Sequence, residues 1–118
     1  MKKSFILLLT ICLFLFGCKE NKNKITEEVA LNSIKNYCYA HFENLKEMED
    51  SDNFTINWEV VSSDDKQIVV MFRSYTGAQV RYYIDKDTGE TYVTEFMPGI
   101  TENEEKTGEV FNINDWLE

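Results

Sequence analysis

The chain has 118 residues, a net charge of −9 and three cysteines. This length predicts one small domain, and an aromatic content of 14% predicts a hydrophobic core that a disordered acidic chain would lack. The excess of acidic side chains argues against binding to nucleic acid through its phosphates, because few cations are available to replace counterions.

Residues 1–18 are organised like an export signal. Lys2 and Lys3 precede a largely apolar run over residues 5–16, which is shorter than the roughly 20 residues that span a bilayer and so predicts a signal-peptide core. The segment Leu15-Phe16-Gly17-Cys18 resembles the lipobox of bacterial lipoproteins, although Phe16 stands where that family has a small or branched residue. The resemblance implies that Cys18 carries diacylglycerol and becomes the new N-terminus. The alternative is an ordinary cleaved signal peptide with an incidental cysteine.

This interpretation divides the chain into a signal peptide (1–18), a tether (19–24) and a single domain (25–118). The tether, KENKNK, has no apolar side chain and predicts a flexible spacer. Without Lys2 and Lys3, ten of the 12 basic side chains remain against 21 acidic ones, which gives a net charge of −11. We expect the protein in the bacterial cell envelope, attached to a membrane through its lipid, with the leaflet and the side left open.

Cysteine and histidine are too few for a disulfide or a metal cluster in the domain. Cys12 leaves with the signal peptide and Cys18 would carry lipid, so Cys38 alone remains. Cys38 and His41, the single histidine, lie one helical turn apart and could be read as a nucleophile and its base. Both fall on or beside a predicted buried stripe, which favours a buried thiol and a half-buried imidazole. We therefore expect no catalytic residue, no metal and no cofactor.

A helix is predicted from Thr26 to about Met48. Thr26 is a suitable N-cap, and acidic side chains follow it in the first turn, where they complement the helix dipole. Apolar side chains then recur at steps of three and four residues, at Leu31, Ile34, Cys38, Phe42 and Leu45. The acidic segment 47–52 is expected to mark the helix end and a solvated loop.

From residue 53 onward, apolar side chains alternate at every second position and predict four strands, over 54–62, 67–74, 78–84 and 90–96. The second is apolar on both faces and is predicted to be an interior strand. Short turns imply an antiparallel meander, and a helix packed on one face makes the fold class α+β. The bulky residues after 110 are expected to dock back on the domain, with an edge strand at 110–113. The alternative is an exposed partner-binding tail with Trp116 as its anchor.

The turn between the last two strands has the spacing that begins a calcium loop, with Asp85, Asp87 and Gly89. The bidentate Glu that closes such a loop would fall on Phe96, so the segment is predicted to be a hairpin turn. Gly89 occupies the position that needs a positive φ.

Two short segments carry a resemblance to a known family. Residues 25–30 (ITEEVA) are similar to an Ile-Thr-x-x-x-Ala helix start, and residues 82–92 (YYIDKDTGETY) to an aromatic-x-hydrophobic-Asp-x-x-Thr-Gly hairpin. Together they resemble a PepSY-type domain over about residues 25–97, with a longer helix and a longer first hairpin than a minimal copy. The resemblance implies a non-catalytic module of secreted or membrane-attached proteins, some associated with restraining peptidases. The hairpin motif also recurs in other small exported α+β domains, including cystatin-like ones.

Aromatic and arginine side chains are concentrated on the third and fourth predicted strands. If the apolar side chains of 54–60 point at the helix, alternation places Arg81, Tyr83 and Tyr92 on the opposite face. Because aromatic and Arg side chains anchor interfaces more often than acids do, we predict a partner-binding face there, with Trp116 as a further candidate. Cross-strand packing explains the same residues equally well.

These features predict a lipid-anchored, exported, non-catalytic module that binds a protein partner in the envelope and, by the resemblance, restrains a peptidase. The alternatives are a small-ligand-binding or cystatin-like envelope lipoprotein and, thirdly, a hydrolase. The expected partners are a membrane, through the anchor, and an envelope protein, with no nucleic acid.

Overall fold

The computed structural model describes residues 24–117, so the predicted signal peptide, Cys18 and all of the tether except Lys24 lie outside the described residues. Two helices are followed by five strands and a short 3-10 helix, in the order α2 (Glu27–His41), α3 (Leu45–Asp50), β1 (Asn57–Ser63), β2 (Gln67–Arg73), β3 (Gln79–Asp85), β4 (Glu90–Phe96), β5 (Glu105–Asn112) and η1 (Ile113–Trp116). Within residues 24–117, no helix has the length and apolar character needed to cross a bilayer.

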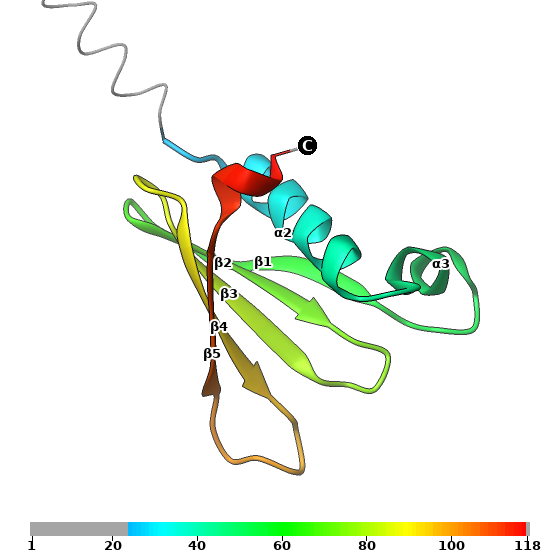
Figure 1. Ribbon diagram of the computed structural model, residues 1–118. Helices are drawn as coiled ribbons and strands as arrows, with labels where there is room; N and C mark the ends of the chain where they lie inside the picture. The colour runs from blue at the N-terminus through cyan, green and yellow to red at the C-terminus, as the bar shows by residue number, and fades with distance from the viewer. Residues whose placement is uncertain (1–23, 118) are drawn as a thin grey trace, which may run out of the picture.

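The strands form one antiparallel sheet in the order β1-β2-β3-β4-β5, and α2 lies along one face of it (Figure 1). The predicted α+β class is confirmed. The predicted interior strand is β2, whose side chains from Ile68 to Phe72 are all buried. Of the expected edge strand at 110–113, residues 110–112 belong to β5, which begins earlier in the chain and makes the sheet five-stranded rather than four-stranded, and Ile113 begins η1.

Both edges of the sheet are irregular. On β1 the pairing register with β2 shifts between Val60 and Ser62. On the other edge the register shifts between Tyr92 and Thr94, where residues 107–109 of β5 lie opposite Val93 alone. Gly108, in the middle of that bulge, has a φ of 88°, a conformation that side chains with a Cβ adopt at a cost.

The first helix begins as predicted and ends earlier than predicted. The Oγ1 of Thr26 accepts a hydrogen bond from the backbone N–H of Val29 at 3.2 Å, which caps α2. The helix ends at His41, so the expectation of one helix to about Met48 is wrong. Asn44 adopts a left-handed φ of 67°, which Asn tolerates better than most residues, and α3 starts after it.

A contact with Glu49 explains where α3 lies. The hydroxyl of Tyr39 on α2 and the indole N–H of Trp58 on β1 both donate to the Glu49 carboxylate, the second at 3.0 Å. The acidic segment 47–52 was expected to be a solvated loop. It is instead partly helical, and it is hydrogen-bonded to α2 and β1 through Glu49.

The core fills the space between α2 and the sheet. Its most buried side chains come from α2, the three central strands and the tail, and include Ile34, Cys38, Ile68, Val70, Tyr82, Ile84, Val93 and Ile113. Full burial of an aliphatic side chain stabilises a fold by about 1.5–3 kcal/mol before the entropy of ordering is subtracted. This layer is therefore the main source of stability.

The C-terminal tail docks on the helix side of the sheet, as expected. The ring of Tyr37 stacks on Phe111 at 3.7 Å between centroids and on His41 at 4.0 Å, and the ring of Trp116 meets Tyr37 edge-on. The side-chain amide of Asn36 donates to the backbone carbonyl of Trp116 at 2.9 Å. The tail is therefore docked and not exposed as that alternative assumed, and a role of the half-buried Trp116 in partner binding stays a prediction.

The 85–89 segment is a hairpin turn, as predicted. The Asp85 carboxylate accepts hydrogen bonds from the backbone N–H groups of Asp87 and Thr88 at 2.8 and 3.0 Å, and these bonds lower its pKa. Gly89 has a φ of 83°, and a Cβ there would lie 2.7 Å from the side chains of Asn112 and Asn114. This glycine therefore also makes room for the docked tail.

Candidate functional site

The face of the sheet opposite α2, here called the open face, carries three of the predicted binding residues. Tyr82 and Ile84 point into the core, so the alternating residues Arg81 and Tyr83 point away from it. Tyr83 pairs with Tyr92 and Arg81 with Thr94 across β3 and β4, which brings all three onto one face as predicted. Trp116 packs on the helix side and does not join them.

A row of side chains crosses the open face in register, formed by Val69, Tyr83, Tyr92 and Val110. The rings of Tyr83 and Tyr92 are stacked, with centroids 4.7 Å apart and an interplanar angle of 2°. From β5, on the other side of β4, the ammonium of Lys106 lies 4.7 Å from the Tyr92 ring centroid. Tyr92 is thus held between a ring and a cation.

Glu104, in the β4–β5 loop, ties that loop to the open face. Its carboxylate accepts hydrogen bonds from the hydroxyl of Thr94, at 2.6 Å, and from the hydroxyl of Tyr83. These two bonds lower the pKa of Glu104, while burial and the same carboxylate raise the pKa of Tyr83. The pair is therefore an ionised carboxylate with a protonated phenol, and no pattern in the sequence pointed to it.

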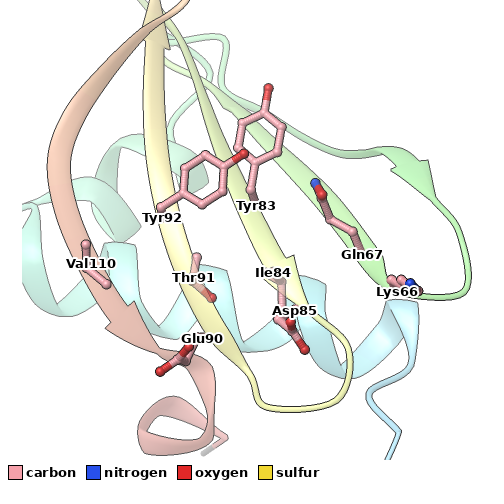
Figure 2. Close-up of a pocket in the computed structure, with 9 residues that line it drawn as sticks. All are labelled: Lys66, Gln67, Tyr83, Ile84, Asp85, Glu90, Thr91, Tyr92 and Val110. Carbon is pink, nitrogen blue, oxygen red and sulfur yellow. The ribbon is translucent and has the colours of Figure 1, made fainter.

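A shallow hollow of about 340 Å³ lies on the open face beside this row. Figure 2 shows Tyr83 and Tyr92 side by side, with Gln67 beyond Tyr83 and Val110 beyond Tyr92. The Val110 side chain is 72% exposed and Tyr92 is 38% exposed. The polar side chains of Lys66, Gln67, Asp85 and Glu90 line the rest of the hollow. Its lining is therefore mixed, aromatic and aliphatic along one part of the edge and polar along the other (Figure 2).

Cys38 and His41 have separate partners and do not face each other as a nucleophile and base. Cys38 is fully buried, its Sγ lies 3.2 Å from the Tyr82 hydroxyl, and burial raises its thiol pKa to about 12. His41 is exposed, and its Nδ1 lies 2.9 Å from the backbone carbonyl oxygen of Tyr37. A thiol in this state does not ionise near neutral pH and cannot be reached by a substrate.

Within residues 24–117, no group of three or more His, Cys, Asp or Glu side chains is placed to hold a metal ion.

No protein-family model matches this sequence, and comparison with curated proteins and with solved structures gives no match. The resemblance to PepSY-type domains is therefore carried by residues 25–30 and 82–92 alone.

Proposed function

We propose that this protein is a non-catalytic protein-binding module, exported and held at a membrane of the bacterial envelope by lipid on Cys18. The observation that carries the binding role is the hollow on the open face, where the exposed side chains of Tyr92 and Val110 line one part and polar side chains line the rest. Protein interfaces combine aromatic and aliphatic contact surface with polar groups in this way.

The packing of Tyr92 favours a protein partner over a small flat ligand. A sugar or a planar ligand that binds by stacking needs a free aromatic face, and the Tyr92 ring is already stacked on Tyr83 and covered by Lys106. A protein partner can instead contact the exposed part of Tyr92 and the Val110 methyl groups and form hydrogen bonds with the polar side chains of the hollow. The PepSY-type resemblance adds a class of partner, a peptidase that the module would restrain.

The state of Cys38 supports a role without catalysis. The strongest nucleophile–base candidate of the domain is a fully buried thiol with a raised pKa, and its neighbouring histidine binds a backbone carbonyl instead. Catalytic sites bring such groups together at a surface that a substrate can reach. The binding proposal needs no such convergence.

Site-directed photocrosslinking tests the binding role in the native envelope. A photoreactive phenylalanine analogue at position 92 or 110 should give the same protein adduct from both positions. The same analogue at Asn32 or Asp65, which are exposed on α2 and on the β1–β2 turn, is the matched control. If adducts form from the controls or from the acidic segment 47–52 and not from positions 92 and 110, the open face is not the binding site.

The anchor has its own test. Cys18→Ser should abolish lipid labelling and move the protein out of the membrane fraction, because the thioether has no other attachment point. The Cys12→Ser variant is the matched control and should be lipidated normally. A Cys18→Ser protein that still fractionates with the membrane would exclude the proposed anchor without affecting the binding role.

A further inference from the structure

A second hollow lies on the helix side of the sheet, where α2 has ended. The chain turns at Phe42 and Asn44 into α3, which Figure 1 shows beyond the end of α2. Between this turn, α3 and the far ends of the first three strands is a cavity of about 310 Å³, here called the corner groove. Its apolar lining is formed chiefly by Phe42, Leu45, Met48, Ile56, Phe72 and Val80.

Large aromatic side chains are exposed at the corner groove. Phe42 is 43% exposed and Tyr75 is 55% exposed, and both line it. Phe54, which is 38% exposed, contacts Tyr75 edge-on with 4.9 Å between ring centroids. Several bulky aromatic rings gathered at one hollow are typical of an interaction site, whereas a single exposed apolar residue is ordinary.

The charged side chains that line the corner groove are both acidic, Glu43 and Glu95. Lysines of α2 and α3 lie over aromatic rings that do not line the groove. The Lys46 ammonium lies over the Tyr39 ring at 4.9 Å, and the Lys35 ammonium lies 5.8 Å from the Trp58 ring. The groove therefore combines an apolar floor with a negative rim. Anionic lipid headgroups and fatty-acid carboxylates would be repelled there, and a second copy of this acidic chain would be repelled as well.

We propose that the corner groove binds a short peptide segment of a partner protein in which one or two bulky apolar side chains are flanked by Lys or Arg. A volume of about 310 Å³ is at the lower end of the ~300–1,000 Å³ of ligand pockets, so it holds one or two such side chains. The flanking cations would pair with Glu43 and Glu95. This site is separate from the hollow on the open face and does not depend on the function proposed for it.

Three labelled peptides measure this specificity on the full-length protein in nanodiscs of zwitterionic lipid, with empty nanodiscs as the blank. The probe is GKFLKG, and the comparison peptides are GKAAKG and GEFLEG. We expect saturable binding of GKFLKG, with at least tenfold weaker binding of the other two. Equal binding of GEFLEG, or no saturable binding of GKFLKG, would overturn the proposal.

Variants of the protein locate the contact. The double variant Glu43→Gln/Glu95→Gln should weaken GKFLKG binding at least fivefold, and Tyr75→Ala should weaken it about tenfold. The matched controls are Asp65→Asn/Glu90→Gln, at the other end of the sheet, and Tyr92→Ala on the open face; both should leave binding unchanged. An equal loss in the controls would assign the binding to general negative charge or to the open face.

Chemical shift mapping of the unmodified protein gives an answer that does not depend on how the variants fold. Titration with GKFLKG should shift the amide resonances of residues 42–48 and 74–80. Shifts confined to residues 83–92 and 110 would contradict the proposal.

Discussion

The two faces of the sheet cover their apolar side chains by different means. On the helix side, α2 and η1 lie over the strands and bury Val70, Tyr82 and Ile84 almost completely. On the open face, Val69 and Met71 are nearly as buried, with 6% and 4% of their surface exposed. Their cross-strand neighbours on that face are Tyr83 and Arg81, long side chains of the same sheet. A single layer of strands can therefore cover part of its own apolar surface.

Both faces also leave some apolar side chains exposed to solvent. The helix side has a packed layer above it only as far as α2 runs, and beyond His41 it opens into the corner groove with Phe42 and Tyr75 exposed. The open face exposes Tyr92 and Val110 at a shallow hollow. On the helix side, apolar surface is exposed where α2 ends, whereas on the open face it is exposed within β4 and β5, which no helix covers.

The largest expected difference in stability is between alanine variants of two neighbouring valines of β2, Val69 and Val70, which point to opposite faces of the sheet. Val70→Ala should lower the free energy of unfolding by about 2.5 kcal/mol, because it leaves a cavity between two layers, and Val69→Ala by about 1 kcal/mol, because neighbouring side chains and water fill the space. Urea unfolding measures both. Equal losses of unfolding free energy in the two variants would mean that the two faces are packed equally tightly, which contradicts the difference described above.

The next largest effect on stability is expected at α3, which follows the end of α2. Glu49→Ala removes the acceptor for the Tyr39 hydroxyl and the Trp58 indole N–H, and it should lower stability by about 2 kcal/mol. Hydrogen exchange in residues 45–50 should become faster as α3 loosens. Glu47→Ala, an exposed acid of the same helix, is the control. Similar exchange in both variants would show that α3 does not depend on this carboxylate.

The smallest expected effect is on the open face and depends on pH. The pKa of Glu104 is lowered below its usual 4.5 in the folded state by bonds from Thr94 and Tyr83, so it adds stability that is fully present above about pH 4.5. That contribution is lost as the pH falls through the folded-state pKa. Because the carboxylate is largely exposed, we expect less than about 1 kcal/mol.

Comparing unfolding at pH 7 and pH 3 isolates this contribution. Glu104→Gln should reduce the loss of stability on acidification, and Glu102→Gln, an exposed acid of the same loop, should not. An unchanged pH dependence in Glu104→Gln would mean that the hydrogen bonds from Thr94 and Tyr83 to Glu104 add nothing to the stability of the folded state.

The first, third and fourth strands could be predicted because apolar side chains alternate along them, and β2 because it is a short apolar run between two turns. The start of α2 could be predicted from its cap and its regular apolar spacing. The same alternation placed Arg81, Tyr83 and Tyr92 on one face. The break in the helix could not be predicted, because Leu45 continues the apolar spacing and the hydrogen bonds to Glu49 come from residues distant in sequence. The full extent of β5 was hidden by its bulge at 107–109, which interrupts the alternation. The position of Trp116 depends on the docking of the whole tail.

The irregular edges of the sheet have a consequence for the proposed attachment to a membrane. Lipid-anchored proteins are concentrated in two dimensions, where unpaired strands of neighbouring molecules meet often. A regular edge would offer a ladder of free N–H and C=O groups to the next molecule and start a growing sheet. The register shift at Val60 on β1 and the 107–109 bulge on β5 interrupt that ladder on both sides. Such edges would let a crowded layer of these domains stay as separate molecules, with their binding surfaces free.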